Sequence, residues 1–593
     1  MMKEELDPVT VEIVGNLLLS IAEEMGIAII KSAYSTNIKE RRDISTAVFD
    51  PEGNMVSQAE HVAMHLGSLL GIVKEVYKKH DRKQIHPGDM FMGNDPYNGG
   101  GTHLPDITVV APVFVNEKLI GWVANLAHHS DVGGKVPGST SGDAVSIYQE
   151  GLKIPLVRIC ERGRLSEDVL SFLTANSRLP KERFGDLEAQ IAANHVGLRR
   201  LVDAYARYGR TLVTSMKELQ VYTERRLRAG IAKLPKGTYS FVDYMDDAGA
   251  ACPDPIAIAV SIAIHGDTME LDFEGTHAQV PGPINVTYNG LLATVFYSLK
   301  ALIDPDIPSN AGIYRAFTVL AKPGLIINAE NPAPVGERID TCQRVADVIF
   351  GALAPAVPER VIACCNSSVT SAIFSASDPK DKDLFYVYLE TIAGGSGASK
   401  HKDGLSGVQV HMTNTSNLPI EALEMEFPLV LIRRYSLRPD SGGPGRFRGG
   451  LGIRRDFECM MDRVAFTGLG DRQAIPPWGL DGGGAGFGGA YYLRRADGSP
   501  EQRLSSKCTD VLLNRGDIVS IQTPGSGGYG NPYERSAESV VLDIVEGKVT
   551  KEKATESYGV VVKEIGGRPV VDEAMTIELR NNAQRHQGAG SWK

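Results

Sequence analysis

The chain has 593 residues, of which 42% are hydrophobic and 23% charged, and its net charge is −10. This composition is typical of a folded protein with several domains, and the lack of any Lys/Arg-rich block argues against nucleic acid or an anionic membrane as partner. The seven cysteines form no C-x-x-C pair, no basic segment opens the chain, and we expect no apolar run long enough to span a bilayer. We therefore expect a cytoplasmic protein with reduced thiols and no membrane contact.

The N-terminal part is expected to combine helices with a hairpin. Asp7-Pro8 is typical of a helix start, and apolar residues at helical spacing predict a helix from about 8 to 34. The stretch DISTAVFDPEGNMVSQAEH predicts two strands joined by an Asp-Pro-Glu-Gly turn and ending near His61. HLGSLLGIVKEVYKKH then predicts a second helix.

Two further strands are expected to pair. ITVVAPVFV and KLIGWVANLA are both apolar, and only the short NEK connection separates them. Pairing would bring the end of the second strand, with its polar HHSDVGG continuation, back beside the start of the first.

The rest of the chain alternates helical and β-rich stretches. Residues 181 to 231 show a helical pattern, and His195 on its apolar seam is expected to be a core residue. From about 236, runs such as GTYSFVDYM and AIAVSIAI predict strands, while LLATVFYSLKALI and TCQRVADVIFGALA predict helices. After about 421 the chain is rich in Gly, which indicates tight turns or close backbone approach. SAESVVLDIVEGKVTKEKATESYG predicts a small helical cap, and NNAQRHQGAGSWK a disordered tail.

These elements predict a large multi-domain α+β fold. We expect four parts: an N-terminal α/β domain (1–235), a central β-rich domain with helices (236–420), a Gly-rich β domain (421–535), and a small helical cap with a flexible tail (536–593).

The sequence contains no G-x-x-x-x-G-K-[ST] phosphate loop, no G-x-S-x-G elbow and no H-E-x-x-H pair. We therefore do not expect this chain alone to bind and hydrolyse ATP.

The stretch GNDPYNGGGTHLPD raises the question of a metal site. His103 and Asp106 are three positions apart, with Pro105 stiffening the backbone between them, and His128 and His129 lie at the end of the paired strand. Two imidazoles and one carboxylate on adjacent strand ends suit Zn²⁺, Mn²⁺ or Fe²⁺ and leave positions open for water or substrate. Spacing alone also allows a set of loop-capping polar residues without a metal.

Several motifs together resemble the hydantoinase B family. NIKERRD, GNDPYNGGGTHLPDITVVAPVF, NLAHHSDVGG, SGGPGRFRGGLG and TPGSGGYGNP occur in that order, and the resemblance runs from about residue 5 to 560. The family comprises the B-type subunits of ATP-dependent N-methylhydantoinases and caprolactamase, and it is similar to part of 5-oxoprolinase and to the α-type subunit of acetone and acetophenone carboxylases.

The resemblance implies a partner and a metal. B-type subunits work with a hydantoinase A-type subunit, which uses ATP and Mg²⁺ to phosphorylate a carbonyl-type oxygen. The carboxylase relatives hold a divalent metal with two His and one Asp, a pattern that His103, Asp106 and His128 match. His129 and Asp131 would then be groups behind the ligands or on the substrate side.

The resemblance leaves the reaction open. In one branch the chain helps to open a cyclic amide or imide with a metal-activated water; in the other it carboxylates a small ketone. We predict catalytic roles for Asp43 and His65, as general bases in either branch, and for His129. The chain length favours the hydrolase, while a scaffold without catalysis would have little need for the His103, Asp106 and His128 set.

Overall fold

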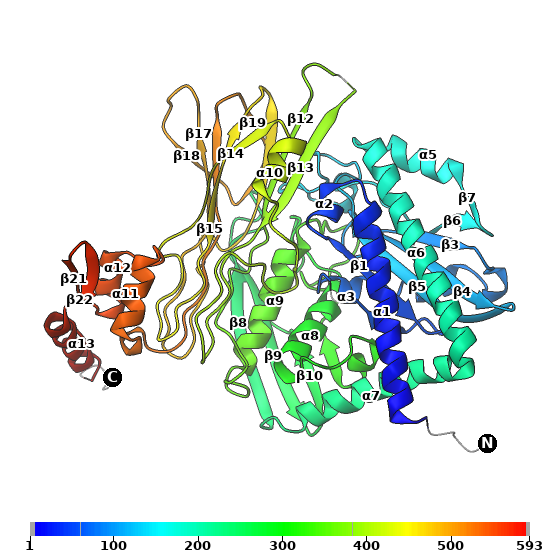
Figure 1. Cartoon of the computed structure of the whole chain (residues 1–593), viewed down its shortest axis with the longest axis horizontal. Helices are drawn as coiled ribbons and strands as arrows, with labels where there is room; N and C mark the ends of the chain where they lie inside the picture. The colour runs from blue at the N-terminus through cyan, green and yellow to red at the C-terminus, as the bar shows by residue number, and fades with distance from the viewer. Residues whose placement is uncertain (1–5, 60, 382, 589–593) are drawn as a thin grey trace.

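The computed structural model describes residues 6–59, 61–381 and 383–588. It confirms the expected α+β class: several separate sheets, each with its own apolar core, are joined by long helices and Gly-rich segments (Figure 1).

A seven-stranded antiparallel sheet forms the centre of the N-terminal part. Its strands, in spatial order, are β2 (Met55–Gln58), β1 (Ile44–Phe49), β5 (Lys118–His128), β4 (Asp106–Val115), β3 (Met90–Gly93), β6 (Val157–Glu161) and β7 (Arg164–Leu165). The predicted pairing of β4 with β5 is confirmed, and the turn between them is made by Asn116 and Glu117, both with positive φ. A two-residue turn of this kind matches the twist of the strands that it joins.

Three long helices, α1 (Pro8–Ser32), α6 (Pro180–Tyr208) and α7 (Arg210–Ile231), share one apolar core with this sheet. α1 begins as predicted, because the Asp7 carboxylate accepts hydrogen bonds from the backbone N–H groups of Val9 and Thr10. The gap between α6 and α7 falls at Gly209, whose φ is +54°. His195 on α6 is exposed, so the expectation that it belongs to the core is wrong.

The expectation that no stretch is long and apolar enough to cross a membrane is wrong for α1. The helix has 25 residues and a mean hydropathy of 1.8 over its most apolar window. A core helix passes the same test, and one face of α1 is buried against the sheet and α6 through Val14, Leu18, Ile21, Ala22, Met25, Gly26 and Ile29.

The predicted helix after His61 is split into α3 (His65–Ser68) and α4 (Ile72–Lys79). Gly71 separates them with a φ of +101°, a left-handed conformation that ends a right-handed helix. The remaining short helices are α2 (Thr36–Lys39), α5 (Glu167–Ala175) and α10 (Ile420–Glu426), and the single-turn 3₁₀ segments are Arg82–Gln84, Ile147–Gln149, Ala311–Arg315 and Pro532–Glu534.

The central part contains a four-stranded sheet with the order β11 (Phe317–Leu320), β10 (Thr268–Asp272), β9 (Ile256–His265) and β8 (Gly237–Met245). The predicted helices are present as α8 (Tyr288–Ile303) and α9 (Arg338–Leu353), and they share an apolar core with the sheet. All sixteen residues of α9 are buried. The N-terminus of α9 is therefore placed firmly against the rest of the molecule.

Two further sheets share a third core. One has the order β13 (Phe385–Ile392), β12 (Thr370–Ser377), β16 (Val464–Leu469) and β19 (Lys507–Leu513); the other has β14 (Val430–Leu437), β15 (Ile453–Cys459), β20 (Ile518–Gln522), β17 (Ala490–Arg494) and β18 (Gln502–Leu504). Phe374 of the first sheet packs on Phe457 of the second with ring centroids 5.0 Å apart, so the two sheets form a sandwich.

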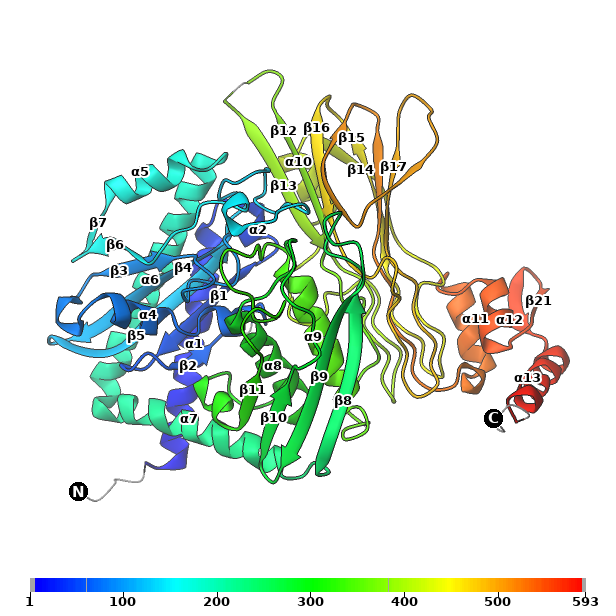
Figure 2. The same ribbon diagram turned by 180° about the vertical axis from the view of Figure 1, so that it is seen from behind.

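Below the sandwich, Gly-rich segments run extended and side by side, as Figures 1 and 2 both show. We call residues 394–407, 441–452, 479–489 and 523–530 the glycine bundle. Its segments are hydrogen-bonded to one another: Gly450 N–H donates to Ser396 C=O at 3.0 Å, and Gly443 N–H to Ser526 C=O at 2.7 Å. A Cβ on Gly397 would lie 1.7 Å from the Ala363 carbonyl oxygen, so the chains approach too closely for any side chain.

The chain ends in a small unit at the far end of the molecule from the seven-stranded sheet (Figure 2). The predicted helical cap is confirmed as α11 (Ala537–Val545) and α12 (Lys551–Tyr558). A hairpin of β21 (Val562–Ile565) and β22 (Arg568–Val571) and helix α13 (Glu573–Gly588) follow it. The expectation of a disordered tail is wrong for residues 581–588, which are helical, and residues 589–593 lie outside the described part of the chain.

Candidate metal centre

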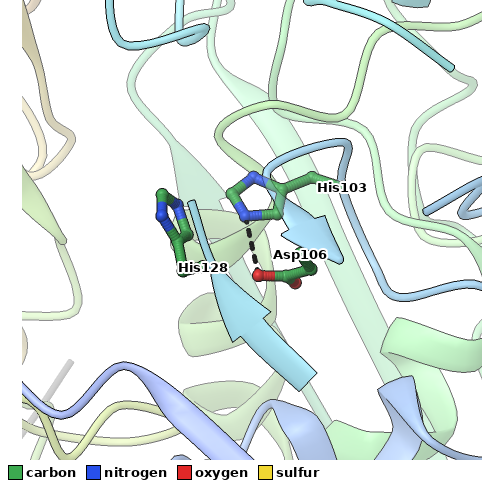
Figure 3. Close-up of side chains that lie close together, drawn as sticks. All are labelled: His103, Asp106 and His128. Carbon is green, nitrogen blue, oxygen red and sulfur yellow. Dashed lines mark hydrogen bonds and ion pairs between the residues drawn. The ribbon is translucent and has the colours of Figure 1, made fainter. Parts of the chain in front are cut away.

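His103, Asp106 and His128 come together at the ends of two interior strands of the seven-stranded sheet (Figure 3). Asp106 begins β4 and His128 ends β5, and the register places these two residues opposite each other. One side-chain ligand atom from each of the three lies within 4.8 Å of the others, and all three side chains are buried. The loop that carries His103 needs Gly101, because a Cβ there would lie 2.8 Å from the Asp106 carbonyl oxygen.

The His103 ring has two tautomers that fit its surroundings. In one, Nδ1–H donates to the Gly336 carbonyl at 3.0 Å, which leaves Nε2 as an acceptor 3.2 Å from Asp106 Oδ1. In the other, Nε2–H donates to Asp106 and Nδ1 accepts from Arg338 Nη1 at 3.1 Å. The first tautomer aims two lone pairs at each other, an arrangement that a cation between them would stabilise.

Asp106 is ionised and held in place from its other side. Arg338 Nη2 donates to Asp106 Oδ2 at 2.8 Å, and the Thr102 hydroxyl donates to the same oxygen at 3.2 Å. Burial alone would raise the pKa of Asp106, but His103 and Arg338 outweigh it and hold that pKa well below its usual range. Oδ1 remains directed at the His103 ring.

The His128 ring is oriented by Asn37. Asn37 Nδ2 donates to the His128 carbonyl at 2.8 Å and lies 3.0 Å from ring Nδ1, while Asn37 Oδ1 accepts from Arg41 at 2.5 Å. Burial is the main reason why the pKa of His128 falls to about 3, and burial followed by the Arg338 charge lowers the pKa of His103. Both imidazoles are therefore neutral at physiological pH, which is the form that binds a metal.

The donor set fits a divalent transition metal. Two neutral imidazoles and one ionised carboxylate provide three ligands of the type that Zn²⁺, Mn²⁺ and Fe²⁺ accept, and the neighbouring groups that such ligands usually have are present in Gly336, Asn37 and Arg338. The group could hold a metal ion, and its identity is left open.

Asp43 and His65 lie beside this group. His65 Nε2 is 3.8 Å from both Asp43 Oδ1 and Asp106 Oδ1. The Ser45 hydroxyl donates to the Ile44 carbonyl at 2.7 Å, so it accepts from His65 Nδ1–H at 3.0 Å. His65 Nε2 therefore points toward the two carboxylates.

His129 lies on the other side of the sheet from the candidate ligands. Its Nε2 is 3.0 Å from Gln190 Oε1 on α6, and burial lowers its pKa. Asp131 accepts from Arg178 at 2.9 Å and from the backbone N–H of Gly133. Both residues support the loop after β5, and the catalytic role expected of His129 stays a prediction.

A cavity of about 60 Å³ opens next to the candidate ligands. Asp43, His65, His103 and His128 line it, together with Arg41 of the NIKERRD motif. Residues that the sequence did not indicate also line it: Glu337, Arg338, Ser371, Thr391 and Thr415. Most of the latter come from the start of α9 and from the sandwich. No local pattern marks them, because they meet the site only through packing between parts far apart in the chain. A larger cavity, about 620 Å³, lies beside Lys74 and Tyr314, away from these groups.

Asp243, Asp347 and Cys364 form a second cluster with metal-like spacing. Arg472 Nη2 lies among them, 2.5 Å from Asp243, 3.2 Å from Asp347 and 2.9 Å from the Cys364 sulfur. The guanidinium already supplies the positive charge there, so this cluster is an arginine-centred ion-pair network.

Known families and proteins resemble this sequence over most of its length. The profile described as Hydantoinase B/oxoprolinase matches residues 7–532. An uncharacterized protein of Methanocaldococcus jannaschii is 40% identical over 97% of this chain and all of its own length. A protein of a Pseudomonas strain, named as the putative B-type subunit of a D-/L-hydantoinase, is 33% identical and covers 97% of this chain and 98% of its own. The beta chain of caprolactamase from Pseudomonas jessenii is 33% identical and covers 96% of this chain and 98% of its own length.

Two solved structures resemble the fold over nearly the whole chain. The crystal structure of ATP-dependent caprolactamase from Pseudomonas jessenii has a TM-score of 0.90 at 32% identity and covers 98% of this chain and 100% of its own. A nucleotide-free structure of acetone carboxylase has a TM-score of 0.92 over 99% of this chain and 84% of its own. Its identity is 20%, so this second likeness shows the fold alone.

Proposed function

Because this chain belongs to the hydantoinase B/oxoprolinase family, we propose that it is the B-type subunit of an ATP-dependent amidohydrolase that opens a cyclic amide or imide. An A-type partner would bind ATP and Mg²⁺ and phosphorylate the amide oxygen. Two observations support this division of labour: relatives of similar length are named as the B-type or beta component of their enzymes, and the sequence has no phosphate loop.

The buried group of His103, Asp106 and His128 beside one cavity carries the proposal. A divalent transition metal, if held by these residues, would supply Lewis acidity and lower the pKa of a water molecule toward neutrality. We assign His65, with Asp43 beside it, to accept the proton of the attacking water, because His65 Nε2 lies toward the same cavity, 3.8 Å from Asp43 Oδ1.

The other lining residues fit a phosphorylated substrate. Arg41 places a buried guanidinium at the cavity, fixed by hydrogen bonds to Asn37 and Thr391, and its Nε has no partner among the described residues. A cation in this position offsets the negative charge of the phosphorylated oxygen. The cavity of about 60 Å³ is smaller than typical ligand pockets, so a cyclic amide must widen it on binding.

The energetic logic follows from the weakness of an amide as an electrophile. Phosphorylation turns the carbonyl oxygen into a leaving group at the expense of ATP. This chain then has to orient a water molecule, accept its proton and stabilise the charge that develops, all of which its lining residues are placed to do.

Reconstitution with the A-type partner tests the proposal. The complex is supplied with ATP and hydantoin, 5-oxoproline, ε-caprolactam or acetone, with and without ¹³C-bicarbonate, and the products are identified by mass. We expect a ring-opened product without bicarbonate, and loss of that product in Asp106→Asn. Label in a new carboxyl group from a ketone, with turnover that stops without bicarbonate, would instead assign the chain to the ketone carboxylases.

A further inference from the structure

Glu337 is a buried carboxyl group in the cavity that neither the sequence motifs nor the proposed metal group uses. It is the last residue before α9, its side chain is 2% exposed, and it lines the same cavity as His65, His103 and His128. The backbone fixes it from both sides, because its own N–H donates to the Pro283 carbonyl at 2.8 Å and the preceding Gly336 carbonyl contacts His103.

The carboxyl group itself is left incompletely bonded. Glu337 Oε1 is buried and has no hydrogen-bond partner among the residues that the structure describes. The adjacent Arg338 does not pair with it, since that guanidinium is directed at Asp106 and Thr102. An unsatisfied buried polar atom is destabilising, so its presence beside a reactive group calls for a functional reason.

The surroundings favour the protonated form of this carboxyl. Burial, followed by the charge of Asp340, raises the pKa of Glu337 well above its usual range, and Arg338 and Lys507 oppose the shift without cancelling it. A carboxyl kept neutral at physiological pH is a proton donor.

We propose that Glu337 is the catalytic acid that protonates the ring nitrogen as it leaves, a role that rests on the proposed amidohydrolase function. Glu337 lines the cavity from the residue before α9, whereas the candidate base His65 lines it from the start of α3 and contacts Ser45 of β1. The two groups are therefore placed to act on different atoms of one substrate.

The chemistry explains why such an acid is needed. Addition of water to the phosphorylated carbon gives a tetrahedral centre that carries a hydroxyl, the phosphorylated oxygen and the ring nitrogen. If the C–O bond to phosphate breaks, phosphate leaves, the intact amide returns and ATP has been consumed without product. If the C–N bond breaks, its electron pair stays on nitrogen, which takes the proton of Glu337.

In the productive path the base first releases the proton of the attacking water to solvent. It then takes the proton of the hydroxyl, and an acyl phosphate remains. A second water molecule splits this acyl phosphate into a carboxylate and inorganic phosphate, and the carboxylate of Glu337 takes a proton back from solvent. Proton delivery to nitrogen therefore decides whether ATP cleavage yields an opened ring or the starting amide.

The test measures phosphate released per ring-opened product in the reconstituted complex, with hydantoin, 5-oxoproline and ε-caprolactam as probes. Wild type is compared with Glu337→Gln, Glu337→Asp and the control Glu330→Gln, which alters an exposed glutamate of the same connecting segment. We expect Glu337→Gln to raise the ratio about tenfold or more, since general acids contribute factors of about 10²–10⁴. The ratio for Glu337→Asp should lie between those of wild type and Glu337→Gln, and the ratio for Glu330→Gln should equal that of wild type.

Two further readouts separate a chemical role from a structural one. Metal content and melting temperature of Glu337→Gln should equal those of wild type. The infrared difference spectrum between wild type and this variant at neutral pH should show the loss of one protonated-carboxyl contribution. An unchanged ratio, or phosphate and product that fall in proportion, would overturn the role of Glu337 while the amidohydrolase stands. A wild-type complex that opens none of the three rings would overturn both.

Discussion

At the scale of single residues, the candidate metal centre depends on side chains that sit in a loop and at strand ends. Replacing His103 by Ala removes one of three ligands but leaves the sheet and its core intact. We expect the metal content per chain, measured by mass spectrometry after dialysis, to fall sharply while the melting temperature stays within a few degrees. His195→Ala, which alters an exposed histidine, is the matched control. A His103→Ala protein with full metal occupancy would contradict the assignment.

The sequence indicates only part of this site. His103, Asp106 and His128 could be predicted because one hairpin, with a two-residue turn, brings them together. Asn37, Arg338 and Glu337 could not, because they reach the site through packing: Arg338 contacts Asp106 across 232 positions of the chain. His129 follows a candidate ligand directly in the sequence, but its Nε2 contacts Gln190 on α6, because neighbouring residues of an extended chain point to opposite sides.

At the scale of elements, α1 has the composition of a membrane-spanning helix but packs as a core helix. Leu18 is fully buried, whereas Ile13 on the same helix is 49% exposed. We expect Leu18→Ala to lower the free energy of unfolding by about 2–5 kcal/mol and Ile13→Ala by less than about 1 kcal/mol, as measured by denaturant unfolding of the purified chain. Equal effects of the two substitutions would show that α1 is not packed as described.

The glycine bundle allows an equally direct test. A Cβ on Gly397 would overlap the Ala363 carbonyl, and because the obstacle is backbone it cannot move aside. We expect Gly397→Ala to cost about 3 kcal/mol or more in unfolding free energy. Gly547→Ala is the control: its surroundings are open, and its φ of +68° costs only about 1 kcal/mol. Similar costs at the two positions would contradict close packing in the bundle.

Helices and strands were predictable where the apolar residues recur with a single spacing, either that of a helix or that of a strand. The strands β4, β5, β8 and β9 and the helices α8 and α9 lie where the sequence places them. The interruptions at Gly71 and Gly209 were not predicted, because the apolar period continues across both and only the backbone conformation breaks it. The Gly-rich segments indicated that the backbone approaches another part of the molecule closely, but not which part. Glycine has no side chain whose spacing could show which face is buried.

At the scale of the whole molecule, buried histidines make stability depend on pH. Burial, followed by the charges of His65 and Arg42, lowers the pKa of His61 from 6.5 to about 4. The unfolded chain then binds a proton that the folded chain does not, so stability present above pH 6.5 is lost as the pH falls toward 4. We expect His61→Asn to reduce this slope by up to about 1.4 kcal/mol per pH unit.

Urea unfolding at several pH values, in the presence of a chelator, measures that slope. The chelator removes any metal contribution, and the exposed His195 provides the control, because His195→Asn should leave the slope unchanged. A slope that is the same in His61→Asn and in wild type would contradict the prediction.

The fourfold division of the chain stays a prediction, although the sheets, the sandwich and the C-terminal unit each have a separate core.

The glycine bundle also constrains the order in which the molecule can be completed during synthesis. Its last segment donates from Gly527 to the carbonyl of Cys364 and accepts at Ser526 from Gly443. A nascent chain that has not yet left the ribosome beyond residue 530 lacks this last segment, and with it the partners of Cys364 and Gly443. The seven-stranded sheet and its helices, which end at residue 231, can fold long before. The ribosome-bound intermediate would thus hold a finished N-terminal unit and an open, unpaired bundle, which makes the interval before termination the stage at which this protein most needs a chaperone.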